Sequence, residues 1–191
     1  MSDAVTDRIN GYLAERLDAQ PQRASVTFLG VEPIDVLRFL AGDDLVYVTV
    51  GCARHPMSEP TDIHADPVRG PRVELVVRMH AGAPLPGLHR RMATLAAAPA
   101  VEGLIIGADA LIDLSEPVWD GSACTAVLLE ADDLGEVALD EPMDPVRFLR
   151  AVPITANEAA WVRLKGATAL RDAWAEAGID VRSPDRAAAK L

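Results

Sequence analysis

Apolar side chains recur at helical spacing at the start of the chain. The repeat falls every fourth residue, at Val5, Ile9, Leu13 and Leu17. This spacing predicts an amphipathic helix, because residues four apart share one face, and Pro21 ends it. We expect this helix, within residues 1–22, to pack on the main body of the protein.

Strand-like patterns follow the helix. The runs at 25–29 and 34–40 are short and rich in apolar or β-branched residues. Leu45–Val50 is apolar or β-branched at every position, which is typical of a strand buried on both faces. We therefore expect Leu45–Val50 to lie inside the sheet, not at its edge.

The segment Arg72–His80 separates its side chains into two faces. Val73, Leu75, Val77 and Met79 alternate with Arg72, Glu74, Val76, Arg78 and His80. Successive side chains of a strand point to opposite faces of the sheet. The pattern therefore predicts a strand with one apolar face and one face that is wet or functional.

The second half of the chain alternates helix and strand patterns less regularly. Residues 88–98 are rich in alanine and predict a helix that Pro99 ends. Strand patterns occupy 104–106, 110–114, 124–129 and 146–154, and Pro153 should lie where no ladder hydrogen bond is needed. We interpret the acidic pairs Asp43-Asp44 and Asp132-Asp133 as turns.

The sequence Thr155-Ala156-Asn157-Glu158 predicts the start of a helix. In this capping box the Thr and Glu side chains satisfy free backbone donors reciprocally, so Glu158 has a structural role. The helix continues to Lys165, and a second helical segment follows Gly166. The tail, residues 183–191, has little to pack against, and we expect it to be flexible.

These elements predict a single α+β domain with a central, mostly antiparallel sheet flanked by helices. A chain of 191 residues fits one domain, since domains commonly contain about 100–200 residues. We divide it into an N-terminal helix (1–22) packed on the domain, the main body (23–182) and the tail (183–191).

Acidic residues outnumber basic ones, 29 to 18, giving a formal net charge of −11. This charge opposes binding to nucleic acid and to anionic lipid, and it would speed encounter with a basic protein. Solubility alone is the other interpretation of the same charge. The chain shows no secretory signal and no apolar run long enough to span a membrane, so we expect a cytoplasmic protein whose two cysteines are reduced thiols.

The segment Arg54–Pro71 is the best candidate for a binding loop. It is long and contains prolines at 56, 60, 67 and 71, and long loops without secondary structure tend to be functional or disordered. We expect a protein partner to meet the residues at its start and the polar side of the strand that follows. These candidates are Gly51, Arg54, His55, Met57, Arg72, Glu74 and Arg78.

A chemical site at Cys52-x-x-His55 is the alternative. Cys52, His55 and His64 could form a soft metal site, or His55 and Arg54 could activate Cys52 as a nucleophile. However, the spacing matches no zinc-finger pattern, and the common phosphate-binding, hydrolase and metalloprotease motifs are missing. We therefore predict no cofactor, no metal and no catalytic residue, with a metal-dependent or thiol enzyme as the competing hypothesis.

Several segments, taken in order, resemble the Suppressor of fused family as it occurs in bacteria. They are SVTFLGVEP, YVTVGCARHPM, GPRVELVVRM, EPVW and AVPITANEAAWVRLKGATAL, and they cover roughly residues 25 to 186. The strand end Val48–Gly51, the pair Glu74-Leu75 and the helix start Pro153–Glu158 are the most specific pieces. The resemblance implies a mixed sheet flanked by helices, in agreement with the patterns above.

The resemblance also implies stoichiometric protein binding and no catalysis. Characterised animal members hold a transcription-factor peptide, and bacterial relatives include proteins proposed as immunity factors that neutralise a partner toxin. This chain lacks the long C-terminal region of the animal proteins, and their peptide-contacting residues have no dependable match here. What transfers is the fold and an expectation of an intracellular protein-binding module whose partner is unidentified.

Overall fold

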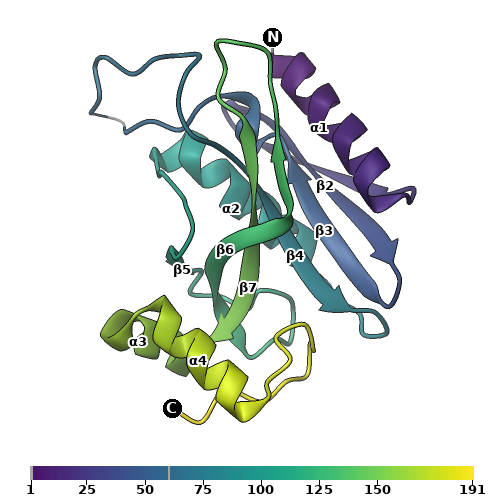
Figure 1. The fold of residues 1–191 in the computed structure, drawn as a ribbon, viewed down its shortest axis with the longest axis vertical. Coiled ribbons are helices and arrows are strands. Elements are labelled where there is room, and N and C mark those ends of the chain that lie inside the picture. The colour runs from purple at the N-terminus through teal and green to yellow at the C-terminus, as the bar shows by residue number, and fades with distance from the viewer. Residues whose placement is uncertain (1, 60) are drawn as a thin grey trace.

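One seven-stranded sheet organises the protein, in the order β1-β2-β3-β4-β7-β6-β5 (Figure 1). The computed structural model describes residues 2–59 and 61–191, and Pro60 of the predicted loop lies outside them. The strands are β1 (Gln22–Phe28), β2 (Val31–Ala41), β3 (Asp44–Val50), β4 (Arg72–His80), β5 (Leu111–Asp113), β6 (Cys124–Val137) and β7 (Val146–Thr155). The helices are α1 (Ser2–Leu17), α2 (Leu88–Glu102), α3 (Ala156–Lys165) and α4 (Ala167–Ala177), with a 3₁₀ turn, η1, at Cys52–Arg54.

The sheet consists of two antiparallel halves joined along one parallel pair. Strands β1 to β4 form a meander, and β5, β6 and β7 pair antiparallel in the second half. The halves meet where β4 pairs with β7 in parallel, from Arg72 beside Val146 to Val76 beside Arg150. The predicted α+β fold with a mostly antiparallel sheet is therefore confirmed, and Leu45–Val50 lies inside the sheet as expected.

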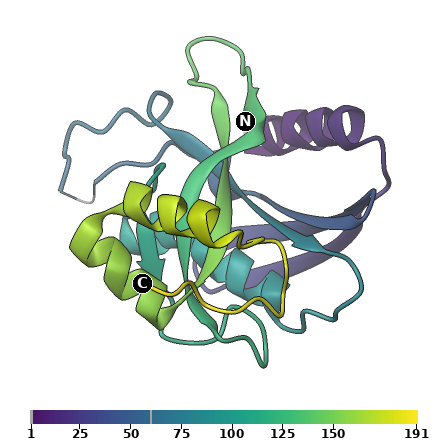
Figure 2. The same ribbon diagram turned by 60° about the horizontal axis from the view of Figure 1, so that its bottom comes forward.

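Helices cover both faces of the sheet. Helix α2 packs on one face, where its buried residues Leu88, Met92 and Leu95 share a core with Val73 and Leu75 of β4. The opposite face carries α1 over one end and the α3–α4 pair over the other (Figures 1 and 2). The sheet is thus the middle of three layers, and the apolar face predicted for the first helix is the face that α1 buries.

Two local predictions in the middle of the chain are wrong. Helix α2 runs through Pro99 to Glu102 and ends at Gly103, whose amide donates to the Pro99 carbonyl in a left-handed cap. Pro99 is tolerated there because it removes a single hydrogen bond in the last turn of the helix. Residues 104–106 form no strand, since the edge of β6 is occupied by the short β5 that follows.

The pair Asp132-Asp133 lies within β6, and its interpretation as a turn is also wrong. The register between β6 and β7 shifts between Ala131 and Glu136, so the two residues sit in an irregular part of the strand. Asp132 is buried there and accepts a hydrogen bond from the amide of Leu134. An acidic pair in a bulge and an acidic pair in a turn look alike in sequence, because both use local backbone donors.

The C-terminal segment docks on Glu158, so the expectation that it has little to pack against is wrong. The capping box at Thr155 and Glu158 is present as predicted. Glu158 is completely buried and also accepts hydrogen bonds from Trp174, from both terminal nitrogens of Arg186 and from the amide of Ala189. The side chain that starts α3 therefore also holds the end of the chain.

Helices α1 to α4 are all too short or too polar to cross a membrane. Their apolar faces are instead turned toward the sheet.

Candidate functional site

A groove of about 670 Å³ lies between the tip of the β1–β2 hairpin, the segment after β3 and the end of α2. One wall is formed by residues 30–34 and the other by residues 96–103, while residues 51–58 line it between them. Helix α2 contributes Ala96, Ala97 and Ala100 to the groove. These side chains are small, so the helix leaves space that larger residues would fill.

Four of the predicted partner-binding residues meet in this groove: Gly51, Arg54, His55 and Met57. Arg54 donates from Nη1 to the carbonyl of Pro33, and His55 Nε2 lies 3.3 Å from Glu32 Oε2. Both contacts tie the segment after β3 to the β1–β2 hairpin. Met57 is almost fully buried, so it forms part of the groove and not of its rim.

Gly51 is required at the point where β3 enters this turn. Its φ is +133°, a backbone conformation that other residues rarely adopt. A Cβ atom there would lie 2.7 Å from Arg54 Nη1 and 3.1 Å from Ile34 Cδ1. The absence of a side chain therefore allows the turn to close on Arg54, as well as supplying the backbone freedom that the sequence indicates.

Glu74 of β4 holds the turn by accepting hydrogen bonds from it. Its Oε1 accepts hydrogen bonds from the amides of Gly51 (2.7 Å) and Ala53 (3.0 Å), and Oε2 accepts from the Thr49 hydroxyl (2.6 Å). Burial raises the pKa of Glu74 to about 7, because the loss of solvation outweighs the hydrogen bonds that favour the charged form. A carboxyl that titrates near neutrality thus supports the groove.

Arg72 also holds this turn, by donating hydrogen bonds to backbone carbonyls. Its Nη1 donates to Ala53 and Arg54, and its Nη2 donates to Val68. The sequence predicted that this side of the strand is wet or functional. Arg72 is 3% exposed and Glu74 is 0% exposed, so neither side chain faces water, and a functional role for them stays a prediction. Backbone groups of a distant turn replace water, and the alternating pattern cannot distinguish these two kinds of polar partner.

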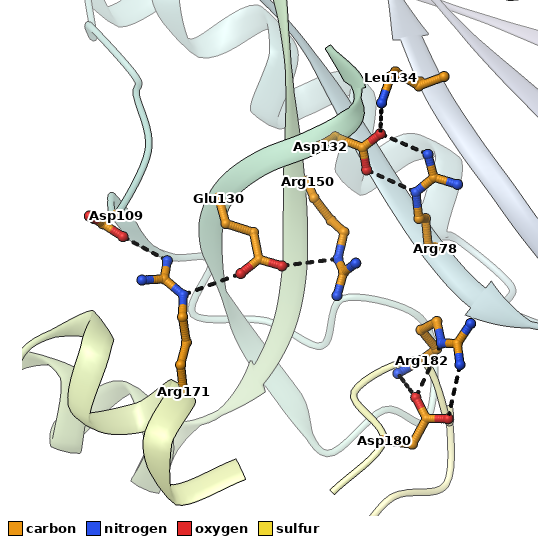
Figure 3. A network of polar contacts seen from close by, with 9 residues as sticks. All are labelled: Arg78, Asp109, Glu130, Asp132, Leu134, Arg150, Arg171, Asp180 and Arg182. Carbon is orange, nitrogen blue, oxygen red and sulfur yellow. Dashed lines mark hydrogen bonds and ion pairs between the residues drawn. The ribbon is translucent and has the colours of Figure 1, made fainter. Parts of the chain in front are cut away.

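Arg78, the remaining candidate, lies away from the groove (Figure 3). It forms a bidentate ion pair with Asp132, in which Nε donates to Oδ2 at 2.8 Å and Nη2 donates to Oδ1 at 2.7 Å. The hydrogen bonds to Asp132 raise the pKa of Arg78. Figure 3 also shows Glu130 between Arg150 and Arg171, so paired charges on this side of the sheet connect β6, β7 and α4.

The predicted loop closes at its neck and projects from the body (Figure 1). The amide of Met57 donates to the carbonyl of Pro71, and the amide of Gly70 donates to Asp144. A second hollow of about 420 Å³ lies beside the loop and shares Met57 and Ser58 with the groove. The loop and the groove therefore form one continuous surface.

The alternative chemical site gains no support from the geometry. Among residues 2–59 and 61–191, no group of three or more His, Cys, Asp or Glu side chains could hold a metal ion. Burial, with a smaller contribution from the charge of Glu74, raises the pKa of the Cys52 thiol well above its ordinary value. This is the opposite of what a nucleophilic thiolate needs.

The sequence patterns missed both walls of the groove, the hairpin residues and the end of α2, among them Glu32, Val101 and Glu102. Val101 is 60% exposed at the end of α2, and Glu102 follows it in a last turn that carries no basic residue. Cations are the residues expected at a helix C-terminus, so an exposed Val-Glu pair there was the available signal.

The comparisons with known proteins agree with the architecture. The family model for Suppressor of fused protein (SUFU) matches residues 30–187, while no curated protein matches the chain. A solved SUFU homolog from Neisseria gonorrhoeae superposes with a TM-score of 0.72 at 16% identity, covering 97% of both chains.

Two further solved structures share the fold. A chain of the Sufu-Fu complex gives a TM-score of 0.65 at 13% identity, covering 98% of this chain and 91% of that one. Drosophila Suppressor of Fused gives 0.64 at 14% identity, covering 97% of this chain but 50% of that one. At such identities the superpositions establish the fold alone.

The protein is a single mixed-sheet α+β domain with a groove on its surface. This chain belongs to the Suppressor of fused family, because the family model matches most of its length. The resemblance carried by the strand ends and the late capping box is therefore confirmed.

Proposed function

We propose that this protein is a protein-binding module that holds a segment of its partner in the groove between the β1–β2 hairpin and α2. The observation that carries the proposal is the convergence of Gly51, Arg54, His55 and Met57 on one surface hollow. A solved relative is named as a complex of Sufu with Fu, which supports a protein as the ligand. Arg72 and Glu74 act indirectly, by fixing the turn that lines the groove.

A more specific form of the proposal is an intracellular immunity protein that neutralises a toxin by stoichiometric binding. The bacterial resemblance motivates it, and the net charge of −11 favours a basic partner in the cytoplasm. The mechanism would be steric: the module covers the partner's functional surface, while the acidic charge speeds encounter. Arg78 would contribute through the paired charges around β6.

The test uses a substitution that fills the groove from an exposed position. Ala100→Trp places a large side chain in the groove, and Ala160→Trp on α3 is the matched control. The wild type should recover from the native cell a partner protein in a one-to-one ratio. This partner should bind A160W with the same affinity as the wild type, and its affinity for A100W should be at least about tenfold lower. Thermal melting of each variant shows that the fold is retained.

Co-expression tests the toxin form separately. The partner alone should stop growth, the wild type and A160W should restore it, and A100W should not. A stoichiometric partner that binds A100W as tightly as the wild type would overturn the groove as the binding site. A partner that does not affect growth would overturn only the toxin form.

A further inference from the structure

Aliphatic side chains are exposed around the groove. Val101 lines it and is 60% exposed, Leu29 at the hairpin tip is fully exposed beside Gly30, and Ile105 is 50% exposed in the adjoining hollow. Large aliphatic residues that gather around a hollow mark a surface that another molecule covers. The apolar part of the surface therefore favours contact with an apolar side chain of a partner.

The same surface is acidic. Glu32 and Glu102 lie on opposite walls of the groove, and Glu59, Asp62 and Asp66 lie in the adjoining hollow. The basic residues of the two hollows are Arg54, His55 and Arg69. Arg54 donates to the carbonyl of Pro33, and His55 lies 3.3 Å from Glu32. Acidic charge thus prevails along the surface.

The end of α2 adds to this negative potential. The last carbonyl groups of a helix carry a partial negative charge, which lysine or arginine usually compensates from the last turn. The last turn of α2, Pro99–Glu102, contains no basic residue and ends in an acidic one. A cationic side chain of a partner would therefore be attracted at the groove both by the carbonyl end of the helix and by the carboxylate of Glu102.

We infer that the groove takes a protein segment in which an aliphatic side chain is followed or preceded by lysine or arginine. This inference rests on the proposed function and names the chemistry of the partner segment. The aliphatic side chain packs against Ala97 and Val101, and the cation lies by Glu32 and Glu102. Acidic peptides, nucleic acid and a second copy of this acidic chain are disfavoured by the same charges.

Displayed random peptides provide the test, because they need no knowledge of the natural partner. Peptides of about ten residues, which reach about 33 Å when extended, are selected against the wild type. The expected sequences are enriched in Leu, Ile or Val next to Lys or Arg. The double variant E32K/E102K should lose affinity for them by at least about tenfold, and its own selection should favour Asp or Glu.

A matched control makes the same change of net charge away from the groove. D172K/E176K reverses two exposed carboxylates on α4 and should keep the wild-type preference. The selected peptides could fail to bind A100W and yet show no enrichment of Lys or Arg. That result would overturn this inference and leave the proposed function standing. Selected peptides that bind A100W as tightly as the wild type would overturn the proposed function. A selection that enriches no peptide would overturn both.

Discussion

Two carboxyl groups, Glu74 beneath the groove and Glu158 at the start of α3, are both inaccessible to solvent, yet their pKa values shift in opposite directions. Both side chains are 0% exposed, and both accept several hydrogen bonds. The pKa of Glu74 is raised to about 7, whereas the pKa of Glu158 is lowered to about 2. Burial alone therefore does not decide the charge of a carboxyl group.

The difference lies in the partners. Burial raises the pKa in both places, but at Glu158 the hydrogen bonds from Arg186 and from three neutral donors outweigh it. The partners of Glu74 within the described residues are a hydroxyl and backbone amides, all neutral. The C-terminal junction thus holds a fixed charge, while the turn beside the groove is held by a group that titrates near neutral pH.

Removing the cation should make Glu158 resemble Glu74, and this is the largest effect we expect. Arg186→Ala leaves a buried carboxylate with neutral donors, which should cost about 3–5 kcal/mol of unfolding free energy near pH 7. The pKa of Glu158 should then rise, so part of the loss should be recovered as the pH falls. Urea unfolding at about pH 5 and about pH 7.5 measures both effects.

The control for Arg186 is an exposed ion pair. Arg163→Ala removes the partner of Asp113, where both side chains are about half exposed, and should change stability by less than about 1 kcal/mol. If R186A lost no more stability than R163A, Glu158 would not depend on its cation.

Glu74→Gln should remove a pH dependence. Because the folded pKa of about 7 exceeds the ordinary value of 4.5, the group contributes stability that is fully present below about 4.5 and lost as the pH rises through about 7. The gap of about 2.5 corresponds to at most about 3 kcal/mol. Glutamine keeps a neutral acceptor for the turn, so this contribution should be constant in E74Q.

The measurement is the difference between wild-type and E74Q unfolding free energies across this pH range. His80, whose pKa is raised by hydrogen bonds to Asp180 and Asp44, titrates in both proteins and cancels in the difference. Parallel pH profiles for the two proteins would show that folding does not raise the pKa of Glu74, and that the contrast with Glu158 does not exist.

Gly51→Ala probes the turn while leaving the Glu74 side chain in the sequence. The strained φ and the close approach to Arg54 should together cost about 1–3 kcal/mol. Gly30→Ala, at an exposed position with φ +82° and open space for a Cβ, controls for backbone strain alone. Thermal unfolding that gave equal losses for the two variants would mean that the contact with Arg54 contributes nothing.

Thr155→Ala tests the capping box beside the other carboxyl, Glu158, while every donor to that carboxyl is kept. It removes the side-chain acceptor that caps the amide of Glu158, while the Thr155 amide can still donate to Glu158, and should cost about 1 kcal/mol. The pKa of Glu158 should stay low, because Arg186 remains. A carboxyl resonance of Glu158 that titrates above pH 4.5 in T155A would contradict the dominant role of the cation.

The sequence was most informative where partners lie close along the chain. The capping box joins residues three apart, and the strand Arg72–His80 shows its period in nine residues, so both were predicted correctly. The groove depends instead on residues that the fold brings together, such as Gly30, Gly51 and Ala97. Its first residues were predicted because a loop begins there. Glu32 carries no local pattern, and the signal at Val101 and Glu102 was missed because the helix was expected to end at Pro99.

Distant polar partners account for most of the wrong predictions. Arg72 and Glu74 were expected on a wet or functional face, and Asp132 was expected in a turn, yet each is buried with a hydrogen-bonding partner. The tail was expected to be free, but Arg186 reaches Glu158 across 28 positions. Periodicity reports which residues are polar and does not report what satisfies them.

The parallel pair of β4 and β7 has a consequence for how the chain folds. Each half of the sheet can form from neighbouring strands, whereas the seam between them joins residues more than seventy positions apart. Loop closure costs conformational entropy before such a contact forms, so we expect the seam to close late. Separate fragments 1–103 and 104–191 would each expose one new strand edge, β4 and β7 respectively. The concentration dependence of their reassociation would measure how strongly these two edges pair with each other.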